Sequence, residues 1–236
     1  MTERPARAPR HRPEAGYARG EETRRRIIDV ALRLFAQRGF EGASTREIAK
    51  EAGVNAPALQ YYFDNKEGVY QACARHIVDS AVEHFLPAVE QAEAVLEQAD
   101  ASGDALFEAF GALLDAIAEH QLLPDDVEHR RLFMSQEQVG QGPDLIFQML
   151  DQSLRPRMAR VTTHLVARYC GMDLKDPLLG MRIMMMMGQL TTFSLGRRLQ
   201  LAKLGWERFG PKEVATIKRA AREHCRVLMD HWRHSP

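Results

Sequence analysis

The chain has 236 residues, of which 45% are hydrophobic and 27% charged, and its formal net charge at pH 7 is zero. This composition is enough to bury a sizeable core, in one domain or in a small domain joined to a larger one. It contains no run of about 18 apolar residues, the length that predicts a membrane span, and the Arg- and Pro-rich N-terminal segment does not resemble a secretory signal. The three cysteines (Cys73, Cys170 and Cys225) are widely spaced, which favours free thiols in a reduced cytoplasm.

Charge is distributed unevenly along the chain. Residues 1–70 hold 13 Lys and Arg against 10 Asp and Glu, whereas the remainder holds 19 against 22. Five arginines crowd the first twenty residues, namely Arg4, Arg7, Arg10, Arg12 and Arg19. A disordered basic arm is therefore expected at 1–20, and it could either lie on nucleic acid or remain a solvated tail.

Apolar residues recur at three- and four-residue spacing after about residue 20, which predicts an all-α fold. The first helix is expected at about 21–37, with Gly39 as its left-handed stop. From residue 66 onward, glycines and prolines divide a longer helical body, and Pro156 should kink or split one of its helices. The helices expected there are at about 66–86, 103–120, 125–138, 143–170, 176–202 and 211–233.

Two short helices are predicted between the first helix and this body. The stretch "STREIAKEAG" has Ser44 and Glu47 at capping-box spacing, so a helix should begin at about Thr45 and end at Gly53. Asn55 can cap the next helix, with Pro57 in its first turn, and Asp64 or Asn65 can cap the helix that follows. Helix, short helix, tight glycine turn and short helix form a helix-turn-helix pattern.

A short exposed helix makes sense if it enters the major groove of DNA, which admits one helix. Gln60 could then pair with adenine and Arg46 with guanine. Taken alone, Arg46 would more often be a surface residue paired with an acidic neighbour, so the whole set carries the prediction. The residues expected to read bases are Arg46, Ala56, Pro57, Gln60 and Tyr61; those expected to hold phosphates are Ser44, Thr45, Tyr62 and Lys66.

The segment "TRRRIIDVALRLFAQRGFEGASTREIAKEAGVNAPALQYYFDNKEGVY" (residues 23–70) resembles the DNA-binding domain of the TetR family of bacterial transcriptional regulators. The resemblance lies in the A-x-x-L-F-x-x-x-G-F core, the T-x-x-x-I-A-x-x-A-G-V step and the Y-x-F-x-x-K-E ending. It places the family's base readers and phosphate contacts at the residues named above. One departure is that Ala56 and Ala58 replace a basic or hydroxylated pair common in the family, so base reading would depend on Gln60 and Arg46.

The resemblance also implies a DNA-binding domain at 21–68 and an effector-binding and dimerisation domain at 69–236. It implies a homodimer on a palindromic operator in a bacterial cytoplasm, released by a small effector, and most often a repressor. Through "RRLFMSQEQ" and "LRPRMARV", the second domain resembles the subgroup of a cephalosporin- and chloramphenicol-responsive regulator.

The last two expected helices are candidates for the dimer interface. One carries a stripe with a small residue near its centre, and the other has apolar side chains at three- and four-residue spacing. Burial within one chain is the simpler alternative. The residues expected at the interface are Met184, Gly188, Thr191, Leu195, Ile217, Ala221, His224, Leu228 and Trp232.

Aromatic and Met side chains of the larger domain could line a pocket for a flat apolar effector, because Met adapts to irregular shapes. Ordinary core packing is the alternative for any single one. The candidates are Phe107, Phe110, Leu114, Phe133, Met134, Phe147, Met185 and Phe193, with Arg131 and Gln189 to orient the ligand.

Other functions are less well supported. No hydrolase, zinc-protease or phosphate-loop motif is present, so neither an enzyme nor a cofactor is predicted. His224, Cys225, His231 and His234 could hold a metal in a metal-responsive regulator. A non-specific DNA-coating protein would bind with steep salt dependence and no sequence preference, which zero net charge argues against.

Overall fold

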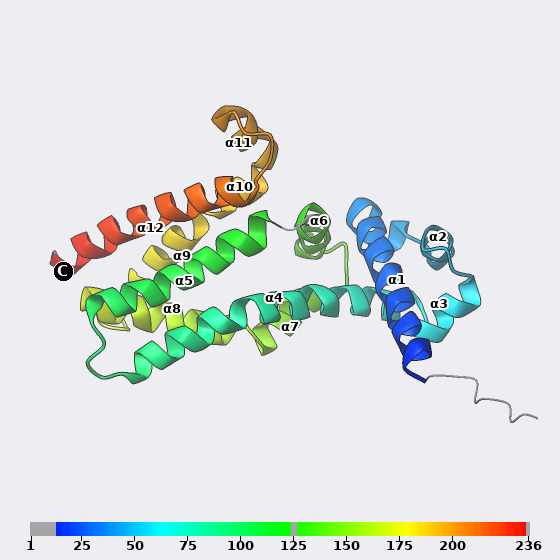
Figure 1. The fold of residues 1–236 in the computed structure, drawn as a ribbon, viewed down its shortest axis with the longest axis horizontal. Coiled ribbons are helices and arrows are strands. Elements are labelled where there is room, and N and C mark those ends of the chain that lie inside the picture. Colours follow the sequence, from blue (N-terminus) through cyan, green and yellow to red (C-terminus); the bar gives the residue numbers. More distant parts are fainter. Residues whose placement is uncertain (1–12, 124–126, 235–236) are drawn as a thin grey trace, which may run out of the picture. The chain divides into compact units, whose positions relative to one another are not determined.

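The computed structural model describes residues 13–123 and 127–234. Within these ranges the regular elements are α-helices and no strand occurs, so the all-α prediction is confirmed. Figure 1 shows the helices in chain order. They are α1 (Pro13–Gly42), α2 (Thr45–Glu51), α3 (Ala56–Phe63), α4 (Lys66–Glu97), α5 (Gly103–Leu122), α6 (Val127–Gln138), α7 (Leu145–Gln152), α8 (Arg155–Cys170), α9 (Leu179–Gly188), α10 (Thr191–Leu195), α11 (Arg197–Leu204) and α12 (Pro211–His234).

The described residues form two compact units. Unit 1 comprises the described part of Met1–His76 together with Leu132–Pro143, and unit 2 comprises Ile77–Arg131 and Asp144–Pro236 as far as they are described. Helices α4 and α6 each contribute residues to both units. The domain limits expected from the sequence, 21–68 and 69–236, remain a prediction.

Helix α1 forms the centre of unit 1. Ile27 and Leu34 are at most 1% exposed, because their spacing places them on the one face that α2 also contacts. The helix begins at Pro13 rather than near residue 21, since proline is well suited to the first turn of a helix and no residue after it forces a break. Gly39 adopts φ 71°, ψ 175° and interrupts the helix, as its position in the sequence predicted.

A cluster of aromatic rings joins α6 to the other helices of unit 1. Tyr70 of α4 stacks on Phe133 of α6 with ring centroids 4.6 Å apart, and the ring of Phe35 of α1 packs at a steep angle to both. The buried Tyr70 hydroxyl donates a hydrogen bond of 3.0 Å to the carboxylate of Glu137, which is itself only 4% exposed. The second half of α6 is thereby packed on α1 and α4.

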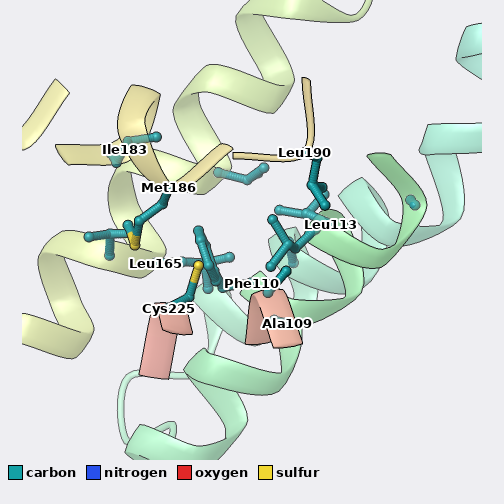
Figure 2. Packing of buried hydrophobic residues seen from close by; sticks show 14 of the residues in the cluster. Ala109, Phe110, Leu113, Leu165, Ile183, Met186, Leu190 and Cys225 are labelled. Atoms are coloured by element: carbon teal, nitrogen blue, oxygen red, sulfur yellow. The ribbon is translucent and has the colours of Figure 1, made fainter. Parts of the chain in front are cut away.

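Unit 2 is built around α5, α8 and α12, which pack against one another. Figure 2 shows Phe110 and Leu113 of α5 beside Leu165 of α8 and Cys225 of α12, with Met186 of α9 above them. All five side chains are at most 1% exposed. The helices expected at 103–120 and 211–233 are confirmed as α5 and α12 within two residues at each end.

The helix boundaries of α4 and of α9–α11 differ from the prediction, whereas the break between α7 and α8 agrees with it. Helix α4 continues through Pro87 to Glu97, because buried Val89 and Ala92 beyond the proline offset the lost backbone hydrogen bond. The helix expected at 143–170 is split into α7 and α8 at Pro156, as predicted. The prediction of a single helix at 176–202 is wrong, because the chain forms α9, α10 and α11, with breaks at Gln189–Leu190 and at Gly196.

The three cysteines are free and buried. Cys73 belongs to unit 1, whereas Cys170 and Cys225 belong to unit 2. Burial raises the pKa of the Cys73 thiol, and it raises the pKa of the Cys170 and Cys225 thiols to about 11. The thiols are therefore protonated and shielded at neutral pH.

Candidate nucleic-acid interface

Helix α2 begins with the predicted capping box. The Ser44 hydroxyl accepts a hydrogen bond from the Glu47 backbone N–H at 3.3 Å and donates one to the Glu47 carboxylate at 2.9 Å. Arg38 of α1 donates to the other carboxylate oxygen at 2.9 Å. The bonds from Ser44 and Arg38 hold the pKa of Glu47 below its usual range. The start of α2 is thus tied both to its own cap and to α1.

A glycine turn and a second cap set the direction of α3. Gly53 has φ 66°, a conformation that favours glycine, and the Val54 backbone N–H then donates to the Ala49 carbonyl at 2.9 Å. The Asn55 side chain accepts from the Ala58 backbone N–H at 2.8 Å, and Pro57 occupies the first turn. Both predicted caps are confirmed.

Helix α3 has one buried and one exposed face. Leu59 and Phe63 are at most 6% exposed and anchor the helix to the rest of unit 1, whereas the Tyr61 ring is 85% exposed. A ring this exposed contributes little to the core, so it is free to contact a partner. All five residues expected to read bases, Arg46, Ala56, Pro57, Gln60 and Tyr61, are exposed.

Arg46 of α2 is an available cation. Its acidic neighbours are engaged elsewhere, because Glu47 pairs with Arg38 and Glu51 pairs with Arg33. Among the described residues, Arg46 itself has no ion-pair partner. The alternative considered from the sequence was an ordinary surface ion pair between Arg46 and an acidic neighbour. The structure does not contain that pair among the described residues.

The residues expected to hold phosphates are more constrained than the base readers. Lys66 donates a hydrogen bond to the Glu41 backbone carbonyl at 3.3 Å and lies 4.5 Å from the centroid of the Phe40 ring. Tyr62 is half-buried, and its ring packs at a steep angle to that of Tyr61, with centroids 5.4 Å apart. Thr45 is half-buried at the start of α2, whereas Ser44 is exposed. These contacts hold the side chains at fixed positions beside α3.

The junction of α3 and α4 is a tight γ-turn centred on Asp64, with φ 68° and ψ −59°. It directs the Phe63 carbonyl toward the Asn65 N–H at 2.7 Å and toward Gly68. The Asn65 side chain accepts from the Gly68 N–H at 2.8 Å and caps α4. Of the two caps considered from the sequence, Asn65 is the one observed, and the turn sets where α3 ends.

Polar residues that were not predicted from the sequence also lie beside α3. A hollow of about 470 Å³ is lined by the exposed end of α3 together with Arg24 of α1 and Gln71 and Arg75 of α4. Gln71 and Arg75 are four residues apart and so share a helix face, which is the signal that could have revealed them.

The residues expected to bind an effector lie in several different places in the structure. Phe107, Phe110 and Leu114 are at most 4% exposed and form part of the helix packing. Gln189 and Phe193 line one hollow of about 390 Å³ between α12 and the α9–α11 segment, and Arg131 lines a different one. Met185 is exposed and Phe147 half-buried, while Phe133 and Met134 belong to unit 1. The composition of the effector site remains a prediction.

The residues expected at the dimer interface differ in how exposed they are. Ile217 and Ala221 are at most 5% exposed and pack within their own chain, whereas Met184 and Leu195 are 75% and 65% exposed. The remaining members vary in exposure: Gly188 and His224 are exposed, and Thr191, Leu228 and Trp232 are half-buried.

No three His, Cys, Asp or Glu side chains come together as a metal site in the part of the chain that the structure describes. Cys225 is buried, and the His224 ring is hydrogen-bonded to the Gln189 side chain at 2.9 Å. Across residues 13–123 and 127–234, no helix combines the length and apolar character needed to cross a membrane.

A capped helix, a left-handed glycine turn and a second capped helix with an exposed polar face define a helix-turn-helix DNA-binding protein. The family model of the TetR bacterial regulatory proteins matches residues 27–73. A model of the C-terminal domain of the HTH-type transcriptional dual regulator CecR matches residues 107–231, more than half of the chain.

Similar proteins agree with these matches. The HTH-type transcriptional dual regulator CecR of Shigella flexneri is 29% identical over 89% of this chain and 93% of its own length. The TetR family regulator PfmR of Thermus thermophilus has the same fold, with a TM-score of 0.54 at 19% identity, covering 86% of this chain and 94% of PfmR. A structure from Pseudomonas aeruginosa PAO1 gives a TM-score of 0.60 at 17% identity over 95% and 97% of the two chains. The chain belongs to the TetR family of DNA-binding transcriptional regulators, with a C-terminal domain of the CecR type.

Proposed function

We propose that this regulator is a homodimeric repressor that binds a palindromic operator on the bacterial nucleoid, in the cytoplasm, and is released by a small, largely apolar effector. The observation that supports operator reading best is the exposed face of α3, which carries Gln60 and Tyr61. Asn55 caps the start of this helix, and the γ-turn at Asp64 sets its end. Arg46, without an ion-pair partner among the described residues, adds a cation suited to guanine.

The experiment that tests operator binding is capture of fragmented genomic DNA by the protein at physiological salt, followed by footprinting. We expect recovery of a short palindrome near promoters. Footprints that overlap a promoter would support repression, and footprints upstream of it would support activation. Random recovery from both the purified and the ligand-stripped refolded protein would contradict a specific regulator.

A dimer is supported by exposed apolar side chains in α9–α11. Met181, Met184 and Met185 share one face of α9 by their spacing, and Leu195 and Leu199 follow in the next two helices. Large exposed apolar groups gathered in one segment are typical of protein interaction surfaces. In a two-fold dimer, the three methionines on this face of α9 would be buried against the partner in both protomers.

Met184→Glu should therefore weaken the dimer, because an isologous interface would bury the introduced carboxylate twice. We expect the dimer dissociation constant, measured by sedimentation velocity across a dilution series, to rise at least about tenfold (1.4 kcal/mol). Leu174→Glu introduces the same charge at an exposed apolar residue outside α9–α11 and serves as the control. An unchanged dissociation constant in Met184→Glu would remove α9 from the interface.

The effector is proposed to change the separation of the two α3 helices in the dimer, which must reach major grooves about one helical turn (~34 Å) apart. The mostly apolar hollow lined by Gln189 and Phe193 supports an apolar ligand. Lowering operator affinity tenfold requires about 1.4 kcal/mol of coupling between the two sites. Equal operator affinity with the compound absent and at saturation would exclude that compound as the effector.

The N-terminal arm is proposed to bind DNA as well. Residues 1–12 lie outside the described residues, but the neighbouring part of α1 approaches α3: a Cβ built at Gly20 would lie 3.7 Å from the Tyr62 hydroxyl. Deleting residues 1–19 should lower operator affinity and flatten its dependence on salt by about 0.9 in log–log slope for each phosphate that the arm neutralises. Titrations at several salt concentrations measure this, and an unchanged slope would show that the arm does not touch DNA.

A further inference from the structure

A hollow in unit 2 combines arginines with an apolar floor. Its volume is about 350 Å³, at the lower end of the range for small-molecule sites. Glu128 and Arg131 of α6 line one side, and residues of α10 and α11 line the other. The α10 and α11 residues are Ser194, Leu195, Arg197, Arg198 and Leu201.

The three arginines make different contacts, and these contacts leave some guanidinium N–H donors available to a ligand. Arg197 donates to the Leu122 carbonyl at 3.2 Å and lies over the Phe209 ring, 4.9 Å from its centroid, which orients its guanidinium. Arg131 has a loose contact of 3.8 Å with Glu128. Arg198 is exposed and, within the described residues, has no ion-pair or hydrogen-bond partner.

The lining carries three guanidinium groups and one carboxylate, so its net charge is positive. A guanidinium presents planar donors that match carboxylate, sulfonate or phosphate oxygens, often two at a time. The Ser194 hydroxyl adds a donor, and Leu195 and Leu201 provide an apolar floor. A lone inorganic anion would leave this floor uncovered, whereas an anion with an apolar body would cover it.

We propose that this hollow, the α6–α11 site, binds an amphipathic organic anion, with its acidic group on Arg131 and Arg198 and its apolar body on Leu195 and Leu201. Arg131 was among the residues expected to orient an effector. It is followed directly by the half of α6 that packs on Tyr70 in unit 1, so a ligand that holds Arg131 acts on a helix shared with the DNA-binding unit. That regulatory consequence rests on the proposed function, whereas the binding itself does not.

The test uses two fluorescent probes with the same ring system. 1-Anilinonaphthalene-8-sulfonate carries an anion, and N-phenyl-1-naphthylamine does not. Full-length protein should bind the sulfonate at least about tenfold more tightly than the uncharged probe. Arg131→Gln combined with Arg198→Gln should weaken sulfonate binding at least about tenfold and change binding of the uncharged probe less than about twofold.

Arg208→Gln combined with Arg219→Gln is the matched control, because it removes the same two charges from exposed arginines that do not line the hollow. It should leave both affinities unchanged. Three results would overturn the proposal: no sulfonate binding, equal affinity for the two probes, or equal losses of sulfonate binding in the control pair and in Arg131→Gln with Arg198→Gln. Operator binding by the same proteins, measured with and without the sulfonate probe, is a separate readout. If the wild-type protein distinguishes the two probes but does not bind the operator, the regulator function is contradicted. If it binds the operator but does not distinguish the probes, the anion site is contradicted.

Discussion

Replacing Arg46 and Gln60 together by alanine is expected to reduce operator affinity by about 2–6 kcal/mol, because each well-paired base contact contributes about 1–3 kcal/mol and such contributions are roughly additive at separate base pairs. The lower limit corresponds to about a 30-fold loss. Both side chains are exposed, so the fold should not change. The measurement is a titration of the footprinted operator and of a scrambled duplex of equal length.

The two duplexes separate base reading from charge. Loss of Gln60 removes no charge, and loss of Arg46 removes one, so binding to the scrambled duplex should fall only slightly. Arg25→Ala with Gln37→Ala is the matched control, since it removes the same two groups from exposed residues of α1. If the test pair lowered affinity for both duplexes equally, Arg46 and Gln60 would be phosphate contacts instead of base readers.

Gly68→Ala is expected to destabilise unit 1 by about 3 kcal/mol, the upper end of the usual penalty for overpacking. A Cβ at this position would lie 2.0 Å from the Phe63 carbonyl oxygen. A flexible side chain could rotate away from such a contact, but this oxygen belongs to the γ-turn at Asp64 that joins α3 to α4. Relief therefore requires movement of the backbone that positions α3, and operator binding should fall with stability.

Gly20→Ala tests the same chemical change where there is room for it. Gly20 lies in α1 of the same unit, and its added Cβ would make only an ordinary contact with the Tyr62 hydroxyl. Alanine there should be neutral or stabilise by up to about 1 kcal/mol. Urea unfolding followed by circular dichroism compares the two variants. Similar stability of Gly68→Ala and the wild type would mean that the γ-turn adjusts easily.

The parts of the fold that could be predicted are those determined by local chemistry. Ser44 and Asn55 cap α2 and α3 because a side-chain oxygen three residues before a backbone N–H can reach it whatever surrounds the helix. The exposed face of α3 followed from the spacing of Leu59 and Phe63 alone.

The parts that could not be predicted depend on contacts distant in sequence. Pro87 looks like a helix stop, and only the burial of Val89 and Ala92 shows why α4 continues. Phe133 looks like a candidate for an effector pocket, yet Tyr70, far from it in the chain, stacks on it in unit 1. The lining of the α6–α11 site comes from helices separated by more than fifty residues, so no local motif marks it.

The burial of the cysteines has a practical consequence, because it gives each unit its own reporter of opening. Cys73 is shielded only as long as unit 1 is closed, and Cys170 and Cys225 only as long as unit 2 is closed. Both tryptophans, Trp206 and Trp232, also belong to unit 2. Thiol-labelling rates resolved by peptide mass can therefore time the opening of each unit separately in unmodified protein, whereas intrinsic fluorescence follows unit 2. A compound that tightens one unit while loosening the other would be visible without any engineered label.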